Sequence, residues 1–203
     1  MGFNGDIVVV RAAAPLSELA PHVDTERHRA RLLWEAGDGW FATHVHHADD
    51  PYAFERPWMT ALAAKAASPV LVCWVFETHV AHVQGVSDEG EWEAWLNPGD
   101  AAAHLAMSRL ELESARSGED VFSDRGELSR PERYAELRDE VVAGLGRARP
   151  RVAAAAVRWA AAAGRIAFAA PIEDVLARNQ GESGPHVFGL LAACLGVGAP
   201  RFV

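Results

Sequence analysis

Hydrophobic positions in the first half of the chain occur in short runs that predict β-strands. Residues 6–11 are rich in β-branched side chains, and residues 39–46 alternate between apolar and polar positions. Residues 70–76 are apolar on both faces, which predicts a central strand covered on both sides. Residues 80–86 predict its hairpin partner, followed by a polar turn at 87–90.

The segment from residue 26 to residue 39 is ambiguous between helix and strand, although Gly37-Asp38-Gly39 predicts a turn at its end. Two short helical elements are expected in the same half. Asp50 can cap a helix that begins at Pro51 and ends before Ser68-Pro69. Further on, Trp92 and Trp95 stand three positions apart, a spacing that suits one helical turn.

In the second half, apolar residues recur at helical spacing. Residues 101–115 predict one helix, and an apolar face from residue 134 to residue 145 predicts another. Proline is favoured in the first turn of a helix, so we expect a new helix from Pro150 to residue 163. Two shorter helices are expected around residues 172–178 and 187–195.

Strands that precede helices, without βαβ alternation, favour an α+β fold. We therefore predict a mostly antiparallel sheet from the N-terminal half, packed against helices from the C-terminal half. The length of 203 residues is compatible with a single domain, 1–203, that is strand-rich over 1–96 and helix-rich over 100–203.

Composition narrows the classes of function. Half of the residues are hydrophobic and 23% are charged, which is typical of a folded globular protein. Cys73 and Cys194 lie inside apolar runs and are expected to behave as small buried hydrophobes. The sequence shows neither a signal peptide nor an apolar run of membrane-spanning length, so we expect a cytoplasmic protein without membrane contact.

The net charge of −9 disfavours nucleic acid as a partner, because sequence-independent affinity for phosphate comes from lysine and arginine. Arg147, Arg149 and Arg151 are a local exception around Pro150. We interpret them as a solvated connection between two helices.

The sequence THVHHADDP at 43–51 raises the question of a metal site. If residues 39–46 form a strand, His44 and His46 point to the same face and offer two imidazoles to zinc or a similar divalent metal. A catalytic zinc needs a third protein ligand, for which His82 and Asp49 are the local candidates. The alternative is a solvated strand end, in which the aspartates serve the turn and the helix start.

Recognised reaction motifs are missing. The metallo-β-lactamase signature H-x-H-x-D-H would need aspartate and histidine where the chain has Ala48 and Asp49. There is no H-E-x-x-H, no paired C-x-x-C, no G-x-S-x-G, and no glycine-rich phosphate loop followed by lysine. These absences argue against nucleotide-dependent and nucleophilic catalysis.

Seven tryptophans are more than a core of this size ordinarily uses. Trp92 and Trp95 have acidic neighbours and stand next to a turn, so they are our candidates for a partly exposed patch that binds a protein partner. A small-molecule site would instead appear as a concave surface lined by Trp40, Trp58 or Trp74.

Three segments carry a resemblance: the opening MGFNGDIVVVR, the stretch SPVLVCWVFETHVAHVQGVSDEGEW and the stretch EDVLARNQGESGPHVFGLLAACLGV. Together they resemble a group of actinobacterial proteins of about this length for which no activity is established. The resemblance therefore implies no catalytic residue.

The sequence leaves three hypotheses. The first is a non-catalytic domain without a cofactor that binds a protein partner or a second copy of itself. The second is a metal-dependent hydrolase that uses His44 and His46, and the third is a small-molecule binding domain.

Overall fold

The computed structural model describes residues 5–20, 28–35, 38–47, 56–76, 78–123, 125–178 and 182–198. The strands in these ranges are β1 (Gly5–Arg11), β2 (His28–Glu35), β3 (Trp40–His47), β4 (Val70–Phe76), β5 (Val80–Ser87) and β6 (Gly90–Leu96). The helices are α1 (Leu16–Leu19), α2 (Arg56–Ala66), α3 (Pro98–Ser117), α4 (Pro131–Ala162), α5 (Ala169–Leu176) and α6 (Gly184–Cys194).

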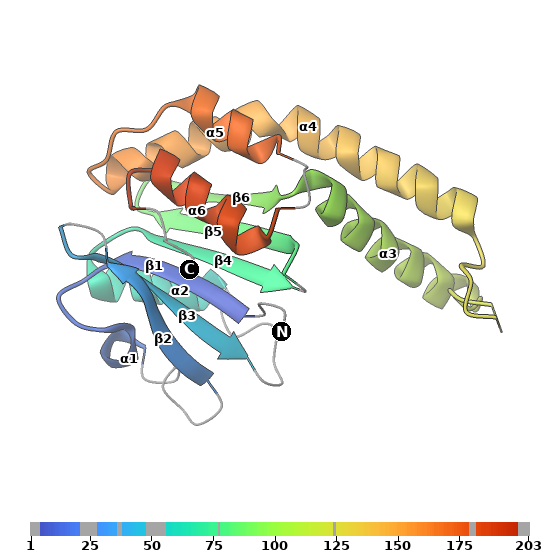
Figure 1. The fold of residues 1–203 in the computed structure, drawn as a ribbon, viewed down its shortest axis with the longest axis horizontal. Helices are drawn as coiled ribbons and strands as arrows, with labels where there is room; N and C mark the ends of the chain where they lie inside the picture. The colour runs from blue at the N-terminus through green and yellow to red at the C-terminus, as the bar shows by residue number, and fades with distance from the viewer. Residues whose placement is uncertain are drawn as a thin grey trace.

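The six strands form one sheet in the order β2-β3-β1-β4-β5-β6, and every neighbouring pair is antiparallel (Figure 1). This confirms the predicted α+β fold, with its antiparallel sheet from the N-terminal half and its helices from the C-terminal half. The central position of β4 is also as predicted. Most of its side chains are buried because helices cover both faces of the sheet there.

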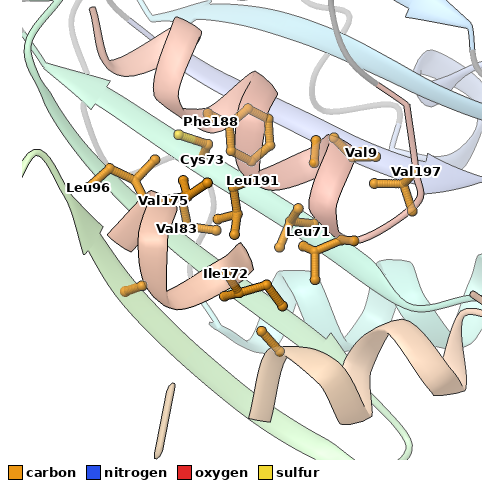
Figure 2. Packing of buried hydrophobic residues seen from close by; sticks show 14 of the residues in the cluster. Val9, Leu71, Cys73, Val83, Leu96, Ile172, Val175, Phe188, Leu191 and Val197 are labelled. Atoms are coloured by element: carbon orange, nitrogen blue, oxygen red, sulfur yellow. The ribbon is translucent and has the colours of Figure 1, made fainter. Parts of the chain in front are cut away.

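One face of the sheet carries the larger core and is covered by α4, α5 and α6 (Figure 1). Figure 2 shows how Leu71 and Cys73 from β4 lie among Ile172 from α5 and Phe188 and Leu191 from α6. These five side chains are fully buried. Their burial is the main contribution that holds the C-terminal helices on the sheet.

The opposite face is covered by α1 and α2, so the helical cover includes elements from the N-terminal half as well. Val8 and Val72 of the sheet pack there with Met59 and Leu62 of α2. The sole lysine ties the two helices together, since Nζ of Lys65 donates to the backbone oxygens of Glu18 and Leu19 at 3.0 and 2.9 Å.

The turn predicted between β2 and β3 is confirmed. Asp38 and Gly39 both have positive φ, of 63° and 76°, as the two central residues of a type I′ hairpin turn do. The segment that was ambiguous in the sequence is the edge strand β2. The helix start expected at Asp50-Pro51 lies outside the described residues, and α2 ends at Ala66, before Ser68-Pro69 as predicted.

Helices α3 and α4 run side by side and extend beyond the sheet (Figure 1). Leu110 and Leu137 are buried between them, and Arg133 donates to the Glu113 carboxylate at 2.7 and 3.1 Å. This hydrogen bond and the neighbouring positive charge lower the pKa of Glu113.

The prediction that Pro150 begins a new helix is wrong, because α4 is continuous from Pro131 to Ala162. An internal proline costs about 3 kcal/mol or more, because it removes one backbone hydrogen bond and crowds the preceding turn. Here Pro150 faces solvent, so its ring displaces no packed side chain. The helix is held on both sides of the proline, by Leu137 against α3 and by Trp159 in the sheet core.

Among the helices that the structure describes, none combines the length and the apolar character needed to cross a membrane.

Candidate functional site

His44 and His46 point to the same face of β3, as their spacing predicted. Their rings lie with centroids 6.2 Å apart, His44 half-buried and His46 exposed. The strand pairing puts His44 opposite Ile7, on the face that α4, α5 and α6 cover.

His82 does not join them. It pairs with Trp74 on β4, and the alternation of side chains places both on the α2 face of the sheet. The His82 ring stacks on Trp95 at 4.5 Å, and its Nε2 lies 3.8 Å from a carboxylate oxygen of Glu93. The other third-ligand candidate, Asp49, lies outside the described residues, within which no three metal-binding side chains gather.

The helical turn predicted for Trp92 and Trp95 is wrong, because both belong to strand β6. Residues three apart on a strand point to opposite faces. Trp92 is 7% exposed in the larger core, where its indole lies so close to Gly85 that a β-carbon there would collide with it. Trp95 lies on the other face, so the two tryptophans do not form a shared surface patch.

Trp95 instead belongs to a half-buried ring cluster with Trp74, Phe76, His82 and His104. Trp74 meets Trp95 at 85°, and the His104 ring from α3 lies 5.7 to 6.0 Å from the rings of Phe76, Trp95 and Trp74. Because His104 occupies the space among these three rings, this cluster packs α3 onto the sheet.

A concave site of the described residues lies elsewhere, between the edge of the sheet and the segment that follows β1. We call it the α1 pocket; its volume is about 520 Å³. It is lined by Ala12, Ala13, Ala14, Pro15, Leu16, Ser17, Ala30, Leu32, Glu35, Gly39, Trp40, Phe41 and Thr43.

Strand alternation explains which side chains reach this pocket. Ala30, Leu32 and Glu35 of β2 pair with Val45, Thr43 and Phe41 of β3. Val45 belongs to the core under α1 and α2, so this row faces that side of the sheet. Trp40 also borders the pocket, but its ring lies in the opposite core, 6.0 Å from Trp159.

The outer wall of the pocket is anchored at both ends. The backbone N–H of Ala12 donates to the Gly39 oxygen at 3.2 Å, next to the hairpin turn. At the other end, the side chain of Leu16, the first residue of α1, is buried. Lys65 donates hydrogen bonds to the last carbonyl oxygens of the same helix. Pro15 fixes its own φ between these anchors, so the wall has little freedom to collapse onto the sheet.

Most side chains that line the pocket are apolar, although polar and apolar atoms contribute almost equally to its exposed surface. Leu32 is 53% exposed and contributes apolar surface to the lining of the pocket. Phe41 supplies the ring surface and is half-buried. Three polar side chains, Ser17, Glu35 and Thr43, interrupt this lining, and none of them has a hydrogen-bond or ion-pair partner in the part of the chain that the structure describes.

The two cysteine thiols, which lie outside the pocket, are poor nucleophiles. Burial raises the pKa of the Cys73 thiol well above its usual range, and nearby Asp6 raises it further. Burial also raises the pKa of Cys194. Both thiols therefore stay protonated near neutral pH. Cys73 is buried as expected, whereas Cys194 is only partly buried.

Sequence reasoning missed the α1 pocket. One signal for it is the apolar segment Ala12-Ala13-Ala14-Pro15-Leu16, which directly follows a buried strand. Most of its side chains are too small to fill the space beside the edge of the sheet. The alternation of Ala30 and Leu32 is a second signal, but it can be recognised only once β2 is known to be a strand.

Comparison with known proteins found no match for this chain among protein-family models, curated proteins or solved structures.

Proposed function

We propose that this protein is a small-molecule binding domain and that the α1 pocket is its binding site. The observation that carries the proposal is an anchored cleft of about 520 Å³ that is lined mostly by apolar side chains, with three polar side chains that lack partners within the described residues. Pockets for small ligands commonly have volumes of roughly 300 to 1,000 Å³, mostly apolar walls and a few polar groups that fix orientation.

The lining indicates the chemistry of the ligand. Leu32 and Phe41 favour an apolar or aromatic body. An ionised Glu35 accepts hydrogen bonds but does not donate them, whereas the hydroxyls of Ser17 and Thr43 can accept or donate. An apolar molecule that carries an amine or a hydroxyl donor fits this combination best.

Binding without catalysis is the simpler role for this pocket. Its described lining contains no histidine, cysteine or lysine, the side chains that most often carry acid–base or covalent chemistry near neutral pH. The hydrolase hypothesis has no third ligand beside His44 and His46 among the described residues. The partner patch loses its basis because Trp92 is buried in the core.

The proposal can be tested with N-phenyl-1-naphthylamine, a neutral aromatic amine that fluoresces in apolar surroundings. An efficiency of about 0.3 kcal/mol for each of its roughly 17 non-hydrogen atoms predicts about 5 kcal/mol of binding free energy. This corresponds to a Kd on the order of 0.1 mM. We expect a saturable one-site titration in that range.

Two substitutions should weaken this binding. Ala30→Phe fills the pocket, and Leu32→Ser removes part of its apolar wall. Leu112→Ser is the matched control, because Leu112 on α3 is also 53% exposed but lies outside the pocket. Equal loss of affinity in Leu32→Ser and Leu112→Ser, or no saturable binding at all, would contradict the proposal.

A further inference from the structure

The solvent-facing side of α4 carries a stripe of exposed residues along the full length of the helix. At about 100° per residue, positions four, seven and eleven apart fall on the same side. The stripe consists of Glu132, Glu136, Asp139, Glu140, Ala143, Arg147, Pro150, Arg151, Ala154, Arg158 and Ala161, all of them exposed.

Charge is segregated along this stripe. All of its carboxylates lie in the N-terminal part of α4, from Glu132 to Glu140. All of its arginines lie in the C-terminal part, from Arg147 to Arg158. Between residues 141 and 172 the chain has five arginines and no aspartate or glutamate, although its net charge is −9.

The basic half has no counter-charge within the part of the chain that is described. None of Arg147, Arg151 and Arg158 makes an ion pair there. The solvated connection between two helices that was expected at Arg147, Arg149 and Arg151 is wrong, because α4 is continuous there. Arg147, Arg151 and Arg158 form one aligned row on this helix. In the acidic half, Glu136 and Glu140 contact Arg133 but remain 65% and 58% exposed.

The two halves are complementary by symmetry. A two-fold axis perpendicular to α4 places residues that are equally distant from one midpoint opposite each other in two copies. Glu140 and Arg147 have their midpoint between Ala143 and Gly144, and so do Glu136 and Arg151. Antiparallel packing of α4 against α4 of a second copy thus brings each acidic half onto a basic half.

The residues around this midpoint are small. Gly144 and Gly146 lie inside a helix, where each glycine costs about 0.5 to 1 kcal/mol relative to alanine. Apart from the backbone of α4 and the two neighbouring residues, no atom lies within 4 Å of the place where a β-carbon would stand on either glycine, so packing against the rest of the described chain does not require them. Ala143 in the stripe and Gly144 next to it leave room for close approach of a second helix at the midpoint.

We propose that the exposed stripe of α4 is the interface of an antiparallel homodimer, in which the acidic half of each helix faces the basic half of the other. A second copy fits the stripe better than a polyanion does. Nucleic acid would be attracted by the arginines but repelled by Glu136, Glu140 and the net charge of the chain.

Sedimentation equilibrium at increasing salt tests the association itself. We expect a monomer–dimer equilibrium whose Kd rises at least about tenfold between roughly 50 and 500 mM NaCl, because exposed ion pairs are screened over this range. A protein that stays monomeric at low salt up to millimolar concentration, or a dimer insensitive to salt, overturns the proposal.

Charge reversal tests the arrangement. Arg147→Glu/Arg151→Glu makes all four paired positions of the stripe acidic, and Glu136→Arg/Glu140→Arg makes all four basic. Each double variant alone should therefore be monomeric. Mixed in equal amounts, the two variants should form a heterodimer, because each half then faces an opposite charge. A mixture that stays monomeric overturns the antiparallel arrangement, and so does a double variant that still forms a homodimer.

The control is Arg31→Glu/Arg125→Glu, at two exposed positions outside α4. It changes the net charge by the same amount as Arg147→Glu/Arg151→Glu and should still dimerise. Far-ultraviolet circular dichroism of each variant verifies the fold, and recovery in the mixture is independent evidence that both variants are folded. These measurements contain no ligand, so their outcome is independent of the proposed small-molecule site.

Discussion

Trp159 offers the sharpest test of how α4 is fixed to the sheet. The side chain is 1% exposed, and its Nε1 donates to the backbone oxygens of Val70 and Val86, each at 3.1 Å. These two residues are paired across β4 and β5. One indole N–H therefore holds the helix to the start of one strand and the end of the next. Trp159→Phe removes this donor and keeps an aromatic ring.

Trp40→Phe is a matched control in the same core. Trp40 is also 1% exposed and lies 6.0 Å from Trp159, but its Nε1 has no hydrogen-bond partner among the described residues. Both substitutions remove a similar volume. Only Trp159→Phe removes a hydrogen-bond donor from two backbone carbonyl oxygens.

The expected difference follows from the net contribution of an intramolecular hydrogen bond, about 0.5 to 1.5 kcal/mol for each of the two bonds that are lost. We expect Trp159→Phe to lower the free energy of unfolding by about 2 kcal/mol more than Trp40→Phe does. For a chain of this length the difference corresponds to about 4 to 8 °C in Tm. The free energy of unfolding can be measured by urea unfolding with circular dichroism as the signal, because each substitution removes a tryptophan and so changes the fluorescence. Equal destabilisation by the two substitutions would refute the structural role of the Trp159 hydrogen bonds.

The remaining predictions concern titration, thiol reactivity and the pocket wall. The pKa of Glu113 is lowered by Arg133, so the pair stabilises the fold above the ordinary carboxyl pKa and this stability is lost as pH falls through the lowered value. Glu113→Gln should therefore destabilise the protein at pH 7, and urea titrations should show the difference from wild type shrinking below about pH 4.5. Cys73 should react with a thiol reagent only after unfolding, whereas the half-buried Cys194 should react slowly in the native state; faster labelling of Cys73 would contradict their burial. Lys65→Met removes two hydrogen bonds to α1, so amide exchange at residues 16–20 should accelerate and phenylnaphthylamine affinity should fall; unchanged values would show that Lys65 does not support the pocket.

The local pattern of the sequence was sufficient for most of the sheet. The strand at residues 70–76 was recognisable because a short run that is apolar at every position and rich in β-branched and aromatic residues favours a strand buried on both faces. The turn at Asp38-Gly39 was recognisable because both residues tolerate positive φ. These features depend on neighbouring residues, and the sequence displays them directly.

The wrong predictions of secondary structure concern segments whose conformation is determined by tertiary contacts. The spacing of Trp92 and Trp95 suits a helix, but Gly85 on the neighbouring strand leaves space for the Trp92 ring, and pairing with β5 makes the segment a strand. Pro150 ordinarily begins a helix, but packing on both of its sides carries α4 through it. Local propensities of about 1 to 3 kcal/mol are outweighed by such packing.

The candidate site was even less visible. The α1 pocket arises from the separation between an anchored segment and a sheet edge, and no spacing in the sequence encodes that separation. His44 and His46 did fall on one face, because alternation along a strand is a local property. Whether His82 joins them depends on sheet faces, which only the strand order defines.

The most direct test of the small-molecule proposal is a titration of ¹⁵N-labelled protein with N-phenyl-1-naphthylamine, followed by amide chemical shifts. We expect saturable changes confined to residues 12–17, 30–35 and 39–43, and their loss in Ala30→Phe. Changes centred on Trp74 and Trp95, or no change at concentrations well above about 0.1 mM, would contradict the assignment of the α1 pocket as the binding site.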